Sequence, residues 1–161
     1  MNGNVTFKYF ENMDKVKAFG NDSLNVLKKH LFKISNTKDG EKLDSLTEKT
    51  PLSIGDHLRV RLKIHIGKAL EYTHLKDTCP SNCEPIDVLS ERKYYPISCY
   101  KTTRDVSTNF FFDYLPHGDY ELTYDMTIQQ RGVLANGIAS LECMYAPNLG
   151  LHTEGSRLKV E

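Results

Sequence analysis

Two segments of this chain alternate apolar and polar residues with a strict period of two. In residues 57–66 the apolar positions are Leu58, Val60, Leu62, Ile64 and Ile66. In residues 120–128 they are Tyr120, Leu122, Tyr124, Met126 and Ile128. Successive side chains of a β-strand point to opposite faces of the sheet. Each segment therefore predicts an antiparallel strand with one buried and one solvated face.

Weaker signals of the same kind fill the rest of the chain. Further strands are predicted at 26–35, 70–75, 137–145 and 155–160, and in an aromatic segment that places Phe110, Phe112 and Tyr114 on one face. Turn-forming clusters at 37–40, 53–56, 115–118 and 136–137 separate them. The only helical candidate is the short segment 10–19. This pattern predicts an all-β fold, an antiparallel Greek-key β-sandwich.

Length and charge limit what such a sandwich can do. The 161 residues correspond to one domain, or at most one domain and a fragment. A chain of this length buries about two-thirds of its surface, enough for a core without a structural metal or disulfides. Lys and Arg number 21 and so do Asp and Glu, which gives a net charge of zero. Binding to nucleic acid or to an anionic membrane surface requires a basic excess, so we expect neither. No apolar run approaches the roughly 20 residues of a spanning helix, so we expect no membrane insertion.

Tyr120 is a candidate for a tyrosine corner. It follows Leu115, Pro116 and Gly118 and enters a strand, as the corner tyrosine does in Greek-key sandwiches. Its hydroxyl would bond back to the backbone upstream. The alternative is an ordinary turn followed by a cross-strand tyrosine.

Two segments of the sequence predict loops. Residues 37–55 are rich in Lys, Asp, Glu and Thr and predict a surface loop. Residues 84–104 look irregular, with two prolines and the pair Tyr94 and Tyr95, and predict a long excursion of the kind that carries binding contacts.

No catalytic constellation emerges, and we expect neither an enzyme nor a cofactor. Cys79 and Cys83, with His74 and Asp77 nearby, suggest a metal site only weakly, because a second well-spaced pair is lacking. A loop disulfide or plain thiols are better interpretations of this pair. No Gly-x-Ser-x-Gly elbow, P-loop or dinucleotide fingerprint occurs. An enzyme that uses Cys79 or Cys83 as nucleophile is the weakest alternative.

Apolar residues at strand ends are more informative. The segment 137–145 predicts that Tyr145 points inward, with Met144 on the opposite face. One of the two then packs in the core, and the other faces water, a loop or another domain. Met and Tyr are favoured anchors of protein contacts.

Several ordered motifs carry a family resemblance. They are 101–121 (KTTRDVSTNFFFDYLPHGDYE), 136–139 (NGIA), 144–147 (MYAP), 152–155 (HTEG), 52–56 (LSIGD), 74–77 (HLKD) and 9–15 (YFENMDK). Together they resemble the last domain of bacterial alpha-2-macroglobulin-like proteins. The resemblance spans nearly the whole chain.

The resemblance implies a macroglobulin-type, immunoglobulin-like sandwich at the carboxyl end of a long, membrane-anchored envelope protein that traps proteases. It implies residues 21–161 as the domain, and residues 1–20 as a leading segment that includes an edge strand of the preceding domain. The chain would be an excised periplasmic fragment, monomeric in isolation. Its partners would be the neighbouring domains of the parent chain, and proteases through the full-length protein.

Site residues follow from the same resemblance. In members with a reactive thioester, a Tyr of a Met-Tyr segment helps to shield it, and this role falls on Tyr145 with Met144. The thioester motif Cys-x-Glu-Gln does not occur in this chain. In an oxidising periplasm, Cys79 and Cys83 become candidates for a disulfide. The alternative function is a free-standing adhesive or ligand-binding sandwich that uses residues 84–104.

Overall fold

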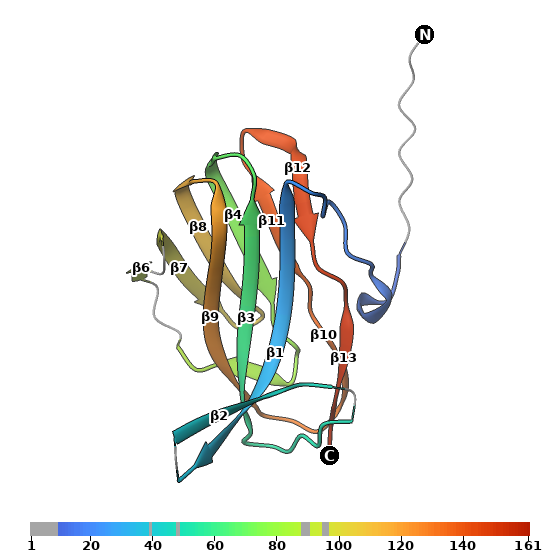
Figure 1. Ribbon diagram of the computed structural model, residues 1–161. Coiled ribbons are helices and arrows are strands. Elements are labelled where there is room, and N and C mark those ends of the chain that lie inside the picture. Colours follow the sequence, from blue (N-terminus) through green and yellow to red (C-terminus); the bar gives the residue numbers. More distant parts are fainter. Residues whose placement is uncertain (1–9, 39, 48, 88–90, 95–96) are drawn as a thin grey trace.

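The computed structural model describes residues 10–161 except 39, 48, 88–90 and 95–96. Its strands form two antiparallel sheets packed face to face, with a separate two-stranded ribbon at one side (Figure 1). The first sheet has the order β2 (Gly40–Ser45), β1 (Asn25–Thr37), β3 (His57–Ile66), β9 (Gly118–Ile128) and β5 (Cys83–Pro85). The second has the order β12 (Ala146–His152), β11 (Ala139–Cys143), β4 (Leu70–Thr78), β8 (Ser107–Leu115), β7 (Ser98–Arg104) and β6 (Glu91–Tyr94). The ribbon pairs β10 (Gly132–Asn136) with β13 (Ser156–Val160). The predicted antiparallel sandwich is confirmed.

The two strongly alternating segments form the centre of the five-stranded sheet. β3 has the predicted bounds, and β9 begins two residues before the predicted start. They pair over ten positions, from His57 opposite Thr127 to Ile66 opposite Gly118. The aliphatic residues of β3 at 58, 60, 62, 64 and 66 are almost completely buried. Full burial of such a side chain stabilises the fold by about 1.5–3 kcal/mol.

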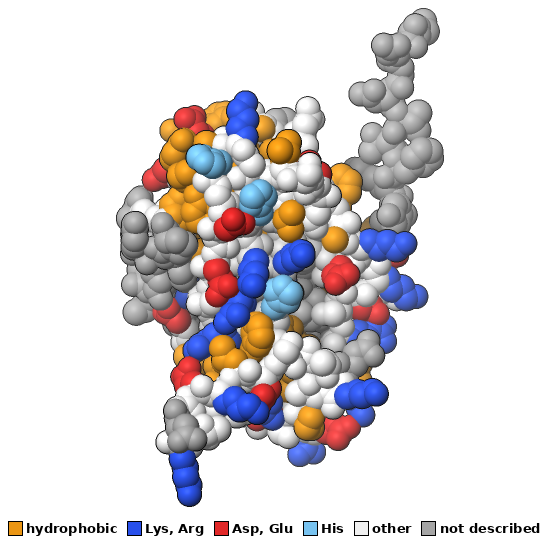
Figure 2. Space-filling view, in the orientation of Figure 1, with side chains coloured by type: hydrophobic (Ala, Val, Ile, Leu, Met, Phe, Trp, Pro, Cys, Tyr) orange, Lys and Arg blue, Asp and Glu red, His pale blue; other side chains and the backbone are white. Residues whose placement is uncertain are grey.

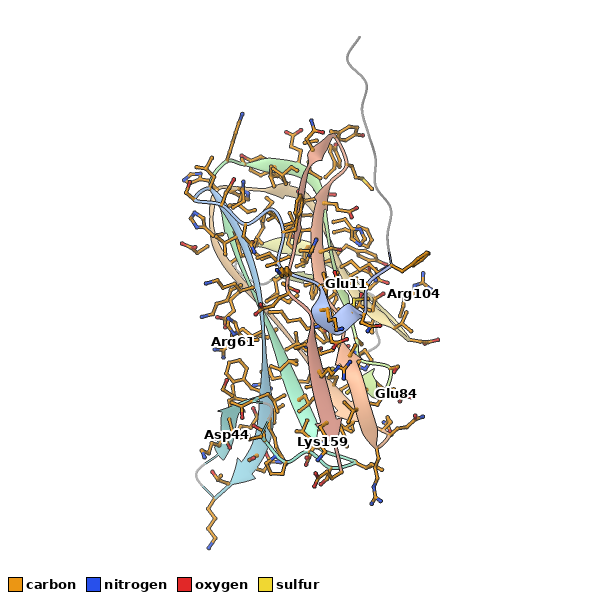
Figure 3. All side chains as sticks on the ribbon, turned by 90° about the vertical axis from the view of Figure 1, so that its right-hand side faces the viewer. Glu11, Asp44, Arg61, Glu84, Arg104 and Lys159 are labelled. Carbon is orange, nitrogen blue, oxygen red and sulfur yellow. The ribbon has the colours of Figure 1, made fainter. Side chains whose placement is uncertain are left out.

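The polar face of this sheet is held by ion pairs between neighbouring strands. Arg59 on β3 donates to both carboxylate oxygens of Asp125 on β9, each at 2.7 Å, and Arg61 lies 3.1 Å from Glu121. The Asp125 carboxylate raises the pKa of Arg59 further above its ordinary value. Figure 2 shows Lys and Arg side chains in a diagonal row over β1 and β3. Arg61 lies on this face in Figure 3, and Arg104 lies on the side of the other sheet.

Both predicted loops contain strands. Residues 37–55 include β2, which forms a hairpin with β1 through a turn at Gly40, whose φ of +118° suits glycine. Residues 84–104 contain β6, β7 and the end of β5, so the prediction of an irregular excursion is wrong for the described part of this segment. Asp87 fixes part of this segment on β7, because its carboxylate accepts a hydrogen bond from the buried Lys101 at 3.0 Å. Tyr95 lies outside the described residues, as does the side chain of Tyr94.

The amino-terminal segment packs along the edge of the six-stranded sheet. The helical candidate forms a single 3-10 turn, η1 (Met13–Lys15). Phe19 then exchanges two 3.0 Å backbone hydrogen bonds with His152 of β12, and the two rings stack 5.6 Å apart. Asp14 binds Arg157 of β13 at 2.6 Å, which lowers the pKa of Asp14. Residues 14–19 therefore contact this sandwich.

Candidate functional site

The turn between β11 and β12 carries the two residues that the resemblance singles out. The register of the two strands shifts between Glu142 and Cys143, and the chain turns at Met144 and Tyr145 before β12 begins. The Met144 side chain is 67% exposed and that of Tyr145 is 77% exposed. The prediction that one of these two side chains packs in the core is wrong. β11 ends at Cys143, so the alternation of buried and exposed side chains along this strand does not extend to Met144 and Tyr145.

The neighbouring strand β4 supports this turn from below. The Met144 N–H donates to the Tyr72 carbonyl at 3.1 Å, and the Cys143 thiol lies 3.2 Å from the Glu71 carbonyl. The Tyr145 ring meets the Tyr72 ring edge to face, with centroids 5.2 Å apart and an interplanar angle of 78°. Such an aromatic pair contributes roughly 0.5–1.5 kcal/mol beyond its area. Tyr145 is thus exposed but held in a defined position.

Tyr72 has an unusual backbone that places its ring on the surface. Its φ is +50°, a conformation that non-glycine residues rarely adopt. Residues 70, 73, 75 and 77 of β4 are buried, so the alternation changes phase at this position. On β8 the phase changes in the same place: Phe110, Phe112 and Leu115 are buried, while Tyr114 is 53% exposed. The prediction that Tyr114 shares a face with Phe110 and Phe112 is therefore wrong.

Four exposed side chains lie at this end of the sandwich, and we call them the aromatic end. Its members are Tyr72, Tyr114, Met144 and Tyr145. It lies where β4 begins and β8 and β11 end, at the top of Figure 1. Exposed aromatic and methionine side chains that gather on one surface mark contact sites for proteins. The chemistry available here is therefore apolar and aromatic packing with hydroxyl hydrogen bonds.

Tyr120 stands at the start of β9, near the same end. Its hydroxyl donates to the Pro116 carbonyl at 3.0 Å, a bond that runs back to the backbone four residues upstream as a tyrosine corner requires. Partial burial raises the pKa of Tyr120, and Tyr114 adds to the effect. Gly118, with a φ of +143°, makes the intervening turn. Tyr120 fixes the connection between β8 and β9, next to the aromatic end.

A buried polar cluster joins the two sheets, and sequence reasoning missed it. Lys29 on β1 donates to Asp77 on β4 at 2.6 Å, and the Tyr124 hydroxyl on β9 donates to the other Asp77 oxygen at 2.6 Å. The side chains of Lys29 and Asp77 are 4% and 0% exposed. Burial, together with the Asp77 charge, raises the pKa of Tyr124 well above its ordinary value. The sequence did contain a signal for this cluster. Lys29 follows the buried Leu27 by two positions on β1, and Asp77 follows the buried Leu75 by two positions on β4, so each charged residue lies on the inward face of its strand.

Cys79 and Cys83 lie at the connection from β4 to β5, which passes from one sheet to the other. Both are buried and carry free thiols. Burial raises the pKa of Cys79, and it raises the pKa of Cys83 to about 12. Both groups therefore remain protonated at neutral pH, whereas a nucleophilic or metal-binding cysteine needs a thiolate.

The other residues considered for a metal site are separated by their strand. His74 is on the outer face of β4, where its ring stacks 4.5 Å from Phe111 and its Nε2 lies 3.0 Å from the Asn109 side-chain oxygen. Asp77 points inward to Lys29 and Tyr124. Within the described residues, no three His, Cys, Asp or Glu side chains come together as metal ligands would. The same residues include no helix that is long and apolar enough to cross a membrane.

Comparison with protein families gives a match over most of the chain. Residues 27–148 match the family model described as the bacterial alpha-2-macroglobulin MG10 domain. This range covers more than two-thirds of the chain and includes the aromatic end, Tyr120 and the buried cluster. A search among proteins of curated function finds no match.

Solved structures with the same fold come from much longer chains. Salmonella alpha-2-macroglobulin reacted with methylamine superposes with a TM-score of 0.68 at 15% identity, over 89% of this chain and 9% of that chain. Escherichia coli alpha-2-macroglobulin activated by porcine elastase gives a TM-score of 0.68 at 15% identity, over 90% of this chain and 14% of that chain. Native E. coli alpha-2-macroglobulin from domain MG7 to the C-terminus gives a TM-score of 0.66 at 15% identity, over 88% of this chain and 24% of that chain. This chain thus spans between 9% and 24% of these three chains.

Proposed function

Because the chain belongs to the family of bacterial alpha-2-macroglobulin MG10 domains, we propose that it serves as a non-catalytic interaction domain of an alpha-2-macroglobulin-like protease inhibitor. Its neighbours would be other domains of a longer polypeptide, since the chain corresponds to a small part of each solved relative. Protease trapping would belong to the full-length protein. We place this domain at the carboxyl end of a membrane-anchored periplasmic protein.

The aromatic end is the observation that carries this proposal. Four large side chains project at one end of the sandwich, and two of them form an ordered edge-to-face pair. Holding apolar surface in water is unfavourable by about 25 cal/mol per Å² relative to burial, so a covering partner gains that free energy. In a multidomain chain this partner would be a neighbouring domain. Tyr145 and Met144 would be its anchors, and they would shield a thioester if the longer protein carries one.

Hydroxyl-radical footprinting tests this role directly. Met144 and Tyr145 should be oxidised quickly in the isolated 161-residue chain and at least about fivefold more slowly in the full-length parent. Ile54, which is exposed in the turn before β3 at the opposite end of the sandwich, serves as the control. Equal oxidation rates of Met144 in both proteins would contradict the proposal.

Cell fractionation with an antibody to this chain tests the broader context. We expect a band much larger than the 161-residue chain in the envelope fraction. A cytosolic band of the size of the chain alone would contradict both the envelope location and the multidomain parent.

A further inference from the structure

The five-stranded sheet has an open edge along the first half of β1. β2 pairs with β1 only from Phe32 to Thr37, while β3 pairs with it from Asn25 to Ile34 on the other side. The stretch 27–31 therefore has a strand neighbour on one side only, within the part of the chain that the structure describes. Unpaired strand edges are templates for the addition of another strand.

Backbone groups on this edge point outward in a regular pattern. The Leu31 carbonyl accepts from the Leu46 N–H, and the Leu27 N–H donates to the Asn21 side-chain oxygen. Peptide groups alternate in direction along a strand, so the N–H and C=O of Lys29 face the same side as these two. Among the described residues, the Leu27 carbonyl, both backbone groups of Lys29 and the Leu31 N–H have no protein partner. Asn21 and Leu46 close the two ends of this four-group stretch.

Two grooves follow this edge and share Lys29 and His30. One, of about 350 Å³, lies between β1 and two other segments, which contribute Ala18 and Asn21 and Thr153 and Glu154. The other, of about 280 Å³, continues toward β2 and is lined by Leu31, Leu46 and Leu158. Figure 3 turns this open side of the sandwich toward the viewer. The grooves provide room beside the edge and an apolar inner wall.

The charges of the sheet indicate what kind of strand fits. Successive strands carry an acidic outer row on β9 (Asp119, Glu121, Asp125), a basic row on β3 (Arg59, Arg61, Lys63), and Lys28 and His30 on β1. Arg59 and Arg61 are paired with β9, and Lys63 stands opposite Glu121 of β9. Lys28 stands directly opposite Lys63 and forms no ion pair with any described residue. Like charges directly opposite each other are destabilising. An acidic row on the open side of β1 would offset them.

We propose that this edge binds an extended peptide segment of a partner protein by strand addition, with acidic residues outward and apolar residues inward. Its backbone would form up to four hydrogen bonds, with the Leu27 carbonyl, Lys29 and the Leu31 N–H. Outward carboxylates would lie beside Lys28 and His30, and inward apolar side chains would enter the grooves next to Leu31 and Leu158. This surface is separate from the aromatic end, and the proposal does not depend on the function proposed above.

A designed strand peptide tests the proposal on the 161-residue chain. The probe is fluorescein-labelled acetyl-EVEVEVE-amide, followed by anisotropy at low salt. We expect saturable binding with Kd below ~1 mM, which weakens as salt is added. The matched probe KVKVKVK should bind at least about tenfold more weakly, as should EVEVEVE that is N-methylated on the residues whose amides face β1. No saturable binding, or equal binding of the N-methylated peptide, overturns the proposal.

Variants and hydrogen exchange locate the contact. Lys28→Glu should weaken binding of the acidic peptide by about tenfold or more, whereas Lys76→Glu, on the outer face of the other sheet, should leave it unchanged. Saturating peptide should protect the amides of Lys29 and Leu31 from exchange. Protection elsewhere without protection of these two amides, or equal effects of the two variants, overturns the proposal.

Discussion

The strand pairs β3–β9 and β4–β8 start from the same pattern and end differently. In β3–β9, ten consecutive pairs keep one aliphatic face inside and one charged face outside. In β4–β8 the same register continues on both sides of one unpaired position, Tyr72 and Asp113, and the inside and outside faces exchange there. The first pair builds the centre of the core. The second builds core at one end and an exposed aromatic surface at the other.

A single backbone conformation produces this difference. The positive φ of Tyr72 interrupts the pairing with Asp113 and turns the following side chains by one position. Leu70 and Leu115 then close the core, while Tyr72 and Tyr114 are left outside. A surface for partners can thus arise from an apolar sequence without extra residues, through a local change of phase between two strands.

Truncating a core ring of β8 should have the largest effect on this comparison. Phe112 is 2% exposed, and Phe112→Ala should lower the free energy of unfolding by about 3–5 kcal/mol through cavity formation. Phe111, on the outer face against His74, is the matched control, and Phe111→Ala should cost about 1 kcal/mol. Urea denaturation of both variants measures the difference. Similar losses of unfolding free energy in the two variants would contradict the assignment of Phe112 to the core and of Phe111 to the outer face of β8.

Alkaline pH should weaken the side of the sandwich at β9. Cys83 pairs with Ile128 of β9, and burial raises the pKa of its thiol from 9.0 to about 12. Between these two pH values the folded chain keeps a proton that the unfolded chain releases. The contribution of the Cys83 thiol to the free energy of unfolding is therefore complete below pH 9 and is lost as the pH rises toward 12. Its slope reaches at most ~1.4 kcal/mol per pH unit. Cys83→Val should flatten the fall of unfolding free energy in this window, and parallel curves for the two proteins would contradict the assignment.

Relieving the backbone strain at Tyr72 should have a smaller effect on the free energy of unfolding, and this effect should be a stabilisation. Tyr72→Gly should stabilise the fold by up to ~1 kcal/mol, because glycine adopts a positive φ without steric cost. Tyr114→Gly removes a similar exposed ring from a residue without positive φ and should cost about 1 kcal/mol. Thermal unfolding of both variants gives the comparison. A loss of stability in Tyr72→Gly equal to that in Tyr114→Gly would argue against strain at Tyr72.

Truncating the most exposed ring should have the smallest effect on stability. Tyr145→Ala loses only the edge contact with Tyr72, so the free energy of unfolding should change by less than ~1 kcal/mol. Differential scanning calorimetry measures this change. A loss of several kcal/mol would place Tyr145 in the core and remove the main support for the aromatic end as a docking surface.

The sequence predicted the parts of the fold that depend on local alternation. The bounds of β3 follow from residues 57–66, since each side chain reports the face on which it lies. The strands within 37–55 and 84–104 could not be predicted, because β2 and β7 are stabilised by pairing with β1 and β8 rather than by a pattern of their own. Edge strands with mixed composition look like loops until their partner is known.

The candidate site was only partly accessible to the same reasoning. Met144 and Tyr145 were identified by resemblance to a family motif, but the expected inward position of Tyr145 was wrong. The exposed positions of Tyr72 and Tyr114 depend on the positive φ of Tyr72. A tyrosine in the sequence does not indicate such a backbone conformation. Lys29 and Asp77 could have been found as charged residues on apolar faces, although their mutual contact spans 48 positions of the chain.

The Tyr72–Tyr145 pair also gives the molecule an optical signal. The chain contains nine tyrosines and no tryptophan, so tyrosine dominates its near-ultraviolet emission. Two of these rings lie in edge-to-face contact at the exposed end of the sandwich. A partner that covers them would change their emission, and a partner with an indole ring would also accept their excitation energy. Contact at this end could thus be followed in solution without an added label.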